Sequence, residues 1–434
     1  MEDISADAQN LIHDRSVSKT DNYYKELNLT GHTSEQMTWY RKRLESLSMS
    51  QASSISNRLL SLDALRGYTI AVMVIVNDPG SRSHVYPPLL HSVWNGITLT
   101  DMVFPFFLFM VGVSITLAYT KRLSAGADKK GLYKKIVFRA FKIMLLGLLA
   151  FCFGEGLLSG VLPRISIVFL VCTLLFLNTN WKQQIWIASM ILIGYWLVMA
   201  LVPVPIDDVI RNALDTGQVQ YRGRLWDIGD IRQISDGLIA ANYEPGVNIT
   251  SWLDRLLGPV GEGLLKTFPA IVSGMIGMLI GKLILAIDEP YKKVTWVFFV
   301  GFSIYLVGGA WGWFMPYNMK LWSSSYTLWT AGVCTMCLAA CILVVDILGY
   351  TKGTKLGTVY GANAITSYVL SLILTLVFYS PGFWGFSLNG LWMDGLTAVG
   401  MPPKLASLLY AILYMYIIYI PAYILYRKRI FIRL

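Results

Sequence analysis

The feature that most constrains the fold of this chain is a series of long apolar segments that begins near Leu59. A helix that crosses a bilayer needs roughly 20 mainly apolar residues, and by that measure the sequence predicts about ten membrane spans. Lipid offers the backbone no hydrogen-bonding partners, so we expect these spans to be helical. The predicted fold is an all-α polytopic membrane protein. Its expected spans are residues 60–78, 100–120, 136–156, 164–179, 184–203, 264–287, 294–314, 324–348, 358–380 and 404–426.

The composition also indicates a lipid environment. Charged residues make up 14% of the 434 residues and hydrophobic residues 55%, whereas soluble proteins carry about 25% charged residues. The net charge of +10 does not indicate nucleic-acid binding, because many Lys and Arg residues lie between apolar segments and do not form a basic exposed face. We therefore expect the bilayer as a partner and no nucleic acid.

The Lys and Arg residues between the spans predict the orientation of the chain. Short cytoplasmic loops are enriched in these residues, and residues 121–135, between the second and third spans, are rich in them. With an even number of spans, the basic tail at residues 427–433 lies on the same side. Both termini are therefore predicted to be cytoplasmic, and the loops that hold His91 and residues 203–262 are predicted to lie outside.

Two segments lie outside this pattern of spans. Residues 1–57 are polar and Ser-rich and lack the apolar core of a signal peptide, so we expect a cytoplasmic extension ahead of a transmembrane domain at 58–434. The long outer loop at 203–262 mixes Trp and Tyr with Asp and Arg. This composition is compatible with a folded cap or with a plain connector.

The five cysteines all lie in apolar segments. Cys334 and Cys337 have CxxC spacing, but neither a second pair nor a histidine accompanies them. Small cysteines in membrane helices are mostly packing residues, and we therefore expect no metal site.

Two short motifs flank the first span. In RLLSLDALRG, Asp63 and Arg66 are three residues apart and share one helix face. They either pin the helix end as an ion pair or anchor an anionic ligand, for which Arg is well suited. The motif VNDPG ends the helix with turn residues, but its Asn77 amide could also donate to an oxyanion.

The stretch before the second span places ionisable residues at the start of a membrane helix. Membrane proteins rarely do this without a functional reason. His91 is followed by Trp94 and Asn95, and Asp101 comes ten residues after His91. A histidine titrates near neutral pH, and a carboxylate that orients it makes it the usual general base. The pattern also fits a plain surface histidine, and His84 in the same loop is the rival base.

Charged residues also occur at membrane depth on the predicted outer side. Glu155 and Arg164 flank the turn between the third and fourth spans, and Glu262 and Lys266 open the sixth. Such residues face a wet cavity or one another. They are therefore either ligand contacts or salt bridges.

These motifs resemble the heparan-alpha-glucosaminide N-acetyltransferase family, including its bacterial relatives, over residues 58–434. The most specific segments are HSVWNGITLTDMVFPFFLFMVG at 91–112 and PYNMKLWSSSYTLWTAG at 316–332, supported by GANAI at 361–365 and by the tail RKRIFIRL. The resemblance implies transfer of acetyl from cytoplasmic acetyl-CoA, a co-substrate, to the amino group of a glucosamine-type sugar on the outer side. A homodimer is implied by the resemblance alone.

The resemblance also assigns residues to roles. The family's active histidine falls on His91 and its neighbouring asparagine on Asn77, with Asp101 in the same polar set. His91 would act as base or as acetyl carrier. The phosphates of CoA need cationic partners, for which the candidates on the cytoplasmic side are Arg66, Lys134, Lys135, Arg139 and Lys142. Asp63, next to Arg66, belongs to the same predicted site. The expected acceptor-binding residues are Trp94, Asn95, Arg164 and Glu262.

The chain departs from the family pattern at two places on the outer side. Pro163 stands where the family usually has Gln, and GPVGEG before the sixth span keeps Glu262 but lacks an aspartate. The acceptor is therefore open, and an O-acetyltransferase of envelope glycans or a secondary transporter of a sugar or organic anion are the alternatives. Transporters often contain internal repeats, and none is convincing here. The apparent lack of a cleavable signal and of a luminal domain favours a bacterial inner membrane.

Overall fold

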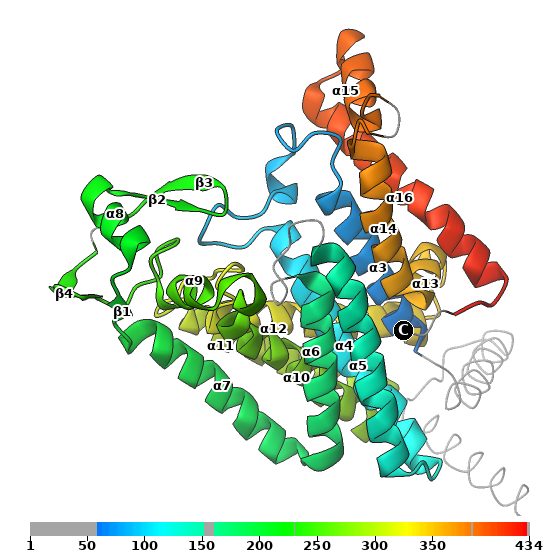
Figure 1. Ribbon diagram of the computed structural model, residues 1–434. Coiled ribbons are helices and arrows are strands. Elements are labelled where there is room, and N and C mark those ends of the chain that lie inside the picture. Colours follow the sequence, from blue (N-terminus) through cyan, green and yellow to red (C-terminus); the bar gives the residue numbers. More distant parts are fainter. Residues whose placement is uncertain (1–58, 152–159, 230, 383–384, 432–434) are drawn as a thin grey trace, which may run out of the picture. The chain divides into compact units, whose positions relative to one another are not determined.

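The computed structural model describes residues 59–151, 160–229, 231–382 and 385–431. The expected extension at 1–57 and Glu155 lie outside these residues. The described residues form a bundle of long helices with one small segment that contains β-strands (Figure 1). The predicted all-α membrane fold is confirmed.

Each of the ten predicted spans falls on a helix or on a pair of successive helices. These are α3 (Leu60–Asn77), α4 (Leu99–Ser124), α5 (Lys129–Phe151), α6 (Val161–Asn178), α7 (Trp181–Leu201), α10 (Leu264–Ala286), α11 (Pro290–Trp311), α12 (Ser324–Cys341) with the π-helix η2 (Ile342–Ile347), α13 (Thr354–Ala362) with α14 (Ala364–Tyr379), and α16 (Pro403–Arg427).

Fewer than ten of these elements have the length and hydropathy of a membrane span. Among the described residues, eight helices do, and the number rises to nine if α13 and α14, bent by 84°, form one span. The tenth predicted span is α5, whose first half carries most of its Lys and Arg residues. These charges lower the hydropathy of α5, and charged side chains favour a position of its first turns outside the hydrocarbon.

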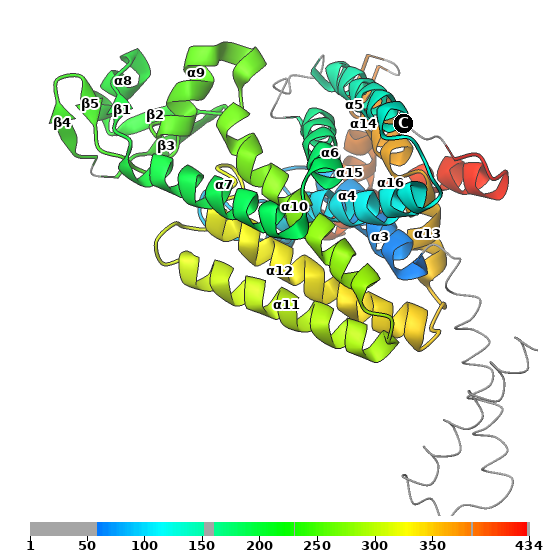
Figure 2. The same ribbon diagram turned by 90° about the horizontal axis from the view of Figure 1, so that it is seen from below.

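Glycines set the closest approach of the helices that support the site. A Cβ on Gly112 of α4 would lie 1.9 Å from the carbonyl oxygen of Gly274 on α10, and one on Gly277 would lie 2.0 Å from that of Phe109. Small residues allow such backbone contact in membranes. Four residues after Gly112, Thr116 donates a hydrogen bond of 2.8 Å to the carbonyl of Met278 on α10. The helices α11 and α12 also lie side by side (Figure 2).

The segment after α7 folds as a cap around a second apolar core, which it shares with Trp94, Met315 and Leu321. Buried residues of this core include Ile210, Val219 and Ile239. The strands pair as β2 with β3, and as β1, β5 and β4 in a second sheet. Its elements are β1 (Val204–Pro205), α8 (Asp208–Thr216), β2 (Gln218–Tyr221), β3 (Arg224–Asp227), β4 (Gln233–Ser235), β5 (Leu238–Ile239) and α9 (Ile249–Gly261).

Two further helices were not predicted from the apolar pattern. The 3₁₀ helix η1 (Pro87–Leu89) lies in the loop between α3 and α4, and α15 (Leu388–Ala398) lies between α14 and α16. Both are too short to span a bilayer. They belong to the end of the bundle that carries His91.

Candidate active site

The centre of the candidate site is a contact between His91 and Asp101. The Nδ1 atom of His91 lies 2.7 Å from Oδ1 of Asp101. The side chain of His91 is 49% exposed, whereas that of Asp101 is 1% exposed. The buried carboxylate therefore orients the ring, and the part of the ring away from Asp101 stays accessible. A general base needs this arrangement.

The start of α4 fixes the position of Asp101. Thr98 is the N-cap of this helix and forms a capping box with Asp101, in which each side chain hydrogen-bonds the backbone of the other. The second carboxylate oxygen of Asp101 accepts hydrogen bonds from the backbone N–H groups of Ser92 and Thr98, both over 3.0 Å. From the other side, the Tyr326 hydroxyl donates to the backbone carbonyl of Asp101.

A buried guanidinium lies on the aromatic side chains next to this dyad. The Cζ atom of Arg164 is 5.0 Å from the centre of the Trp322 ring and 5.9 Å from that of Phe104. Trp322 in turn contacts Tyr326 edge to face, with 5.7 Å between ring centres. Arg164 is buried, and none of the described carboxylates forms an ion pair with it. A buried cation of this kind requires an acceptor.

The loop that follows His91 is held between the cap and the segment before α12. Trp94 is buried and donates to the carbonyl of Tyr243 over 2.8 Å. Asn95 accepts a hydrogen bond of 3.1 Å from the Asn318 amide, and Lys320 donates to the Val93 carbonyl. The structure thus gives both Trp94 and Asn95 contacts within the protein, and it buries Trp94 but leaves Asn95 exposed.

Lys320 also connects this loop to the cap. Its ammonium nitrogen lies 5.6 Å from the ring centre of Trp94 and 4.9 Å from that of Trp226. Burial lowers the pKa of Lys320, and the charge of Arg222 adds to this, while Asp101 acts in the opposite direction. The candidate base therefore lies beside a half-buried cation.

The charged residues Glu262 and Lys266, at the start of α10, do not pair with each other. Glu262 forms an ion pair of 3.2 Å with Arg222, in the turn between β2 and β3. Lys266 pairs with Asp254 over 2.5 Å, and both are nearly buried. Each acidic residue therefore has a structural partner, and Glu262 lies under the tip of the cap hairpin.

The other predicted residues lie away from the dyad or have structural contacts. Asn77 is exposed at the end of α3, and no hydrogen bond among the described residues joins it to His91. Arg66 binds Asp63 over 2.8 Å and the Gly361 carbonyl over 2.6 Å. These contacts support the helix-pinning interpretation of the Asp63–Arg66 pair.

Two basic residues of α5, both predicted to bind CoA, lie over aromatic rings. The Cζ atom of Arg139 is 4.7 Å from the ring centre of Phe169, and Nζ of Lys142 is 5.3 Å from that of Phe138.

Sequence reasoning missed three residues that build the site, namely Lys320, Trp322 and Tyr326. All three lie in the segment 316–332, which the resemblance identified as specific without assigning a role to any side chain. Their distance in sequence from His91 hid the contacts.

Comparisons with known proteins cover the part of the chain that holds this site. Residues 58–211, which include His91, Asp101 and Arg164, match the family described as "Heparan-alpha-glucosaminide N-acetyltransferase, catalytic". The human (Homo sapiens) heparan-alpha-glucosaminide N-acetyltransferase is 28% identical over 432 residues, covering 87% of this chain and 60% of the human protein.

The mouse (Mus musculus) enzyme of the same name is 29% identical over 367 residues, covering 73% of this chain and 53% of the mouse protein. This chain thus spans little more than half the length of these relatives. The matches confirm the resemblance seen in the motifs: residues 58–211 are similar to the catalytic part of this family, and most of the chain is similar to the human and mouse enzymes of that name.

Proposed function

We propose that this protein is a membrane acetyltransferase that moves acetyl from acetyl-CoA to the amino group of a glucosamine-type sugar. The observation that carries the proposal is the contact of 2.7 Å between His91 and the buried Asp101. The activity named for the human and mouse relatives supports the reaction type. An accessible imidazole held by a carboxylate supplies the base that such a transfer requires.

The contact with Asp101 supports Nε2 as the reactive nitrogen of His91. When the N–H at Nδ1 donates its hydrogen bond to Asp101, the lone pair of Nε2 is free. In direct transfer, Nε2 accepts the proton of the sugar amine as the amine nitrogen attacks the thioester carbon. The new C–N bond forms, the C–S bond breaks, and the CoA thiolate takes the proton from His91.

In a two-step transfer, His91 itself attacks the thioester. Nε2 forms a bond to the acetyl carbon, and CoA leaves as the thiolate. The sugar amine then attacks the acetyl-imidazole, loses a proton to the leaving thiolate or to water, and releases His91. Both routes need Asp101 in the same place, because it stabilises the imidazolium that each of them forms.

Other residues have proposed supporting roles. Arg164 would bind a substrate oxygen, because its buried guanidinium has no carboxylate partner among the described residues. Asn77 would support the tetrahedral oxyanion. Trp94 and Glu262, through their contacts with the cap, and Asn95, through its contact with Asn318, would shape the acceptor side. Arg139, Lys142 and Arg66 would hold the CoA phosphates on the other face of the membrane, and Asp63 would orient Arg66.

The first experiment measures transfer from radiolabelled acetyl-CoA to glucosamine by the purified protein in vesicles. We expect His91→Ala to abolish formation of acetylglucosamine and Asp101→Asn to lower kcat about 10²- to 10⁴-fold, the usual contribution of an oriented base. His32→Ala, in the N-terminal extension, is the matched control and should keep wild-type activity.

Three other outcomes would change the assignment. Loss of activity in His84→Ala but not in His91→Ala would move the base to His84. Transfer to hydroxyl acceptors alone would make the protein an O-acetyltransferase. CoA-independent uptake of sugar, without any transfer, would indicate a transporter.

A further inference from the structure

One cation, Lys320, contacts both the loop that holds the candidate base and the cap. Its ammonium donates a hydrogen bond to the carbonyl of Val93, two residues after His91. The same nitrogen lies 5.6 Å from the ring centre of Trp94, in that loop, and 4.9 Å from that of Trp226, on β3 of the cap. All three contacts are made by the charged group, and a cation is attracted to the face of a Trp ring.

The backbone next to Lys320 is anchored to the bundle. The N–H of Leu321 donates to Oδ1 of Asn318 over 2.9 Å, and its carbonyl accepts a hydrogen bond of 2.6 Å from the Tyr195 hydroxyl on α7. Leu321 is fully buried. Lys320 therefore extends from a fixed position, so its ammonium restrains the loop and the cap.

The loop after His91 needs such a restraint if the base is to stay in place. Within the described residues, Asp101 is the sole hydrogen-bonding partner of the His91 side chain. The ring reaches that carboxylate only while the backbone around it keeps its position. The N–H of Ser92 donates to Asp101 over 3.0 Å, and the carbonyl of Val93, the next residue, is the one that Lys320 binds.

The charge of Lys320 depends on its surroundings. Burial lowers the pKa of Lys320, and the charges of Arg222 and Arg224 lower it further, whereas Asp101 raises it. The ammonium thus loses its proton at a lower pH than an exposed lysine does. An arginine at this position would stay charged, because its guanidinium keeps its proton in proteins. The charged and titratable groups around the ammonium are His91, Asp101, Tyr221, Arg222 and Arg224.

We propose that Lys320 is a positioning residue for His91. Its ammonium ties the loop after His91 to the cap, and this keeps the imidazole on Asp101. The role in catalysis rests on the proposed acetyl transfer, but the restraint itself is a property of the folded protein and is measurable without any transfer.

The first test follows amide hydrogen exchange of the full-length protein in detergent by mass spectrometry. We expect Lys320→Met to speed exchange at residues 92–96 and 224–227 about tenfold or more, because a hydrogen bond to a charged group usually contributes that much. Lys320→Arg, which keeps the charge, should exchange as slowly as the wild type. Residues 81–86, which hold the rival His84, should not change.

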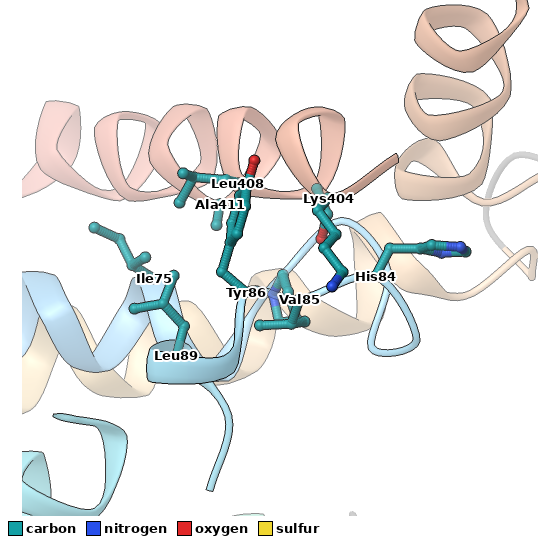
Figure 3. Close-up of a pocket in the computed structure, with 10 residues that line it drawn as sticks. Ile75, His84, Val85, Tyr86, Leu89, Lys404, Leu408 and Ala411 are labelled. Atoms are coloured by element: carbon teal, nitrogen blue, oxygen red, sulfur yellow. The ribbon is translucent and has the colours of Figure 1, made fainter. Parts of the chain in front are cut away.

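Two lysines provide matched controls. Lys282 makes the same kinds of contact elsewhere: it donates to Gln184 over 2.7 Å and lies 5.2 Å from the ring centre of Phe176. Lys404 is exposed at the end of the bundle that carries His91 and lines the small pocket between α3 and α16 (Figure 3). Lys282→Met and Lys404→Met should leave exchange at residues 92–96 unchanged.

The second test measures acetyl transfer. Lys320→Met should lower kcat about tenfold with an unchanged KM for acetyl-CoA, and Lys320→Arg should restore it. As the pH rises from 8 to 10, the wild type should lose kcat relative to Lys320→Arg, because only the lysine loses its proton. The same pH comparison of exchange at residues 92–96 tests the restraint in a folded protein if Lys320→Met folds poorly.

Three results would overturn the proposal. They are unchanged exchange at residues 92–96 in Lys320→Met, equal acceleration there in Lys282→Met or Lys404→Met, and a loss of kcat in Lys320→Arg as large as in Lys320→Met. Faster exchange in Lys320→Met together with a wild type that transfers no acetyl would reject the proposed function and leave the restraint established.

Discussion

At the residue scale, Asp101 performs two tasks with separate oxygens. One oxygen binds His91, and the other accepts hydrogen bonds from the backbone at Ser92 and Thr98. The orientation of the candidate base is therefore coupled to the first turn of α4. Because the Asp101 side chain is also held by the backbone of α4, it cannot move freely. The His91 imidazole that it binds is therefore preorganised.

Asp78, just past the end of α3, gives a testable pH dependence of stability. Burial raises the pKa of this carboxyl to about 7, against the opposing effects of the Thr375 hydrogen bond and of Arg82. The folded state thus holds a proton that the unfolded chain releases near pH 3.8. The contribution of Asp78 to stability is full below that pH, declines as the pH rises, and is lost above about 7.

Asp78→Asn should remove this dependence, because the amide stays neutral and can still accept the Thr375 hydrogen bond. The difference in unfolding free energy between wild type and variant should change by about 4 kcal/mol at most across this window. Melting temperatures measured from pH 4 to pH 8 check this. The exposed control Asp236→Asn should follow the wild-type curve, and parallel curves for wild type and Asp78→Asn would contradict the prediction.

The sequence located the near neighbours in the site but not the distant ones. The pairs His91–Asp101 and Asp63–Arg66 are ten and three residues apart, so a loop or one helix turn brings them together. The contact of Tyr326 with Asp101 joins residues 225 apart. Such contacts depend on which helices pack together, and hydropathy does not specify that.

At the element scale, the α4–α10 contact depends on glycine. Since a Cβ on Gly112 would lie 1.9 Å from the Gly274 carbonyl oxygen, Gly112→Ala must push the two backbones apart. We expect a loss of about 1–3 kcal/mol or more, as in other overpacked cores, and a lower yield of folded protein. Melting temperature in detergent measures the effect.

A matched glycine provides the control. At Gly194 in α7, a Cβ would meet no atom of a neighbouring element within 4 Å, and alanine is the better helix former. Gly194→Ala should therefore keep or slightly raise the melting temperature. A Gly112→Ala protein as stable as the wild type would show that α4 and α10 can separate without cost.

The helices themselves were predictable, but their breaks were not. A single predicted span at 358–380 covers α13 and α14, which meet at 84°. The break lies at Asn363, whose amide donates to the Ile430 carbonyl over 3.1 Å. An apolar pattern gives the length of a span and not its direction, so a bend fixed by a contact 67 residues away stays hidden.

At the scale of the whole molecule, basic residues are unevenly divided between the two ends of the bundle. The end away from His91 carries residues 121–135, Lys292, Lys352 and the tail at 427–429, whereas the short loops at the His91 end carry few Lys or Arg residues. The positive-inside rule then predicts that the His91 end faces away from the cytoplasm. This orientation decides whether acetyl must cross the membrane in the proposed reaction, whose donor would be cytoplasmic acetyl-CoA.

Single cysteines introduced into intact cells test the orientation. Ser83→Cys lies in the exposed loop after α3 and should react with a membrane-impermeant thiol reagent added outside. Lys130→Cys and Lys352→Cys, at the opposite end, should react only after permeabilisation. The unsubstituted protein sets the background, which should be low for the buried Cys172 and Cys334. The reverse labelling pattern would place His91 on the acetyl-CoA side, and the acceptor would then be a cytoplasmic amine reached without any transfer across the bilayer.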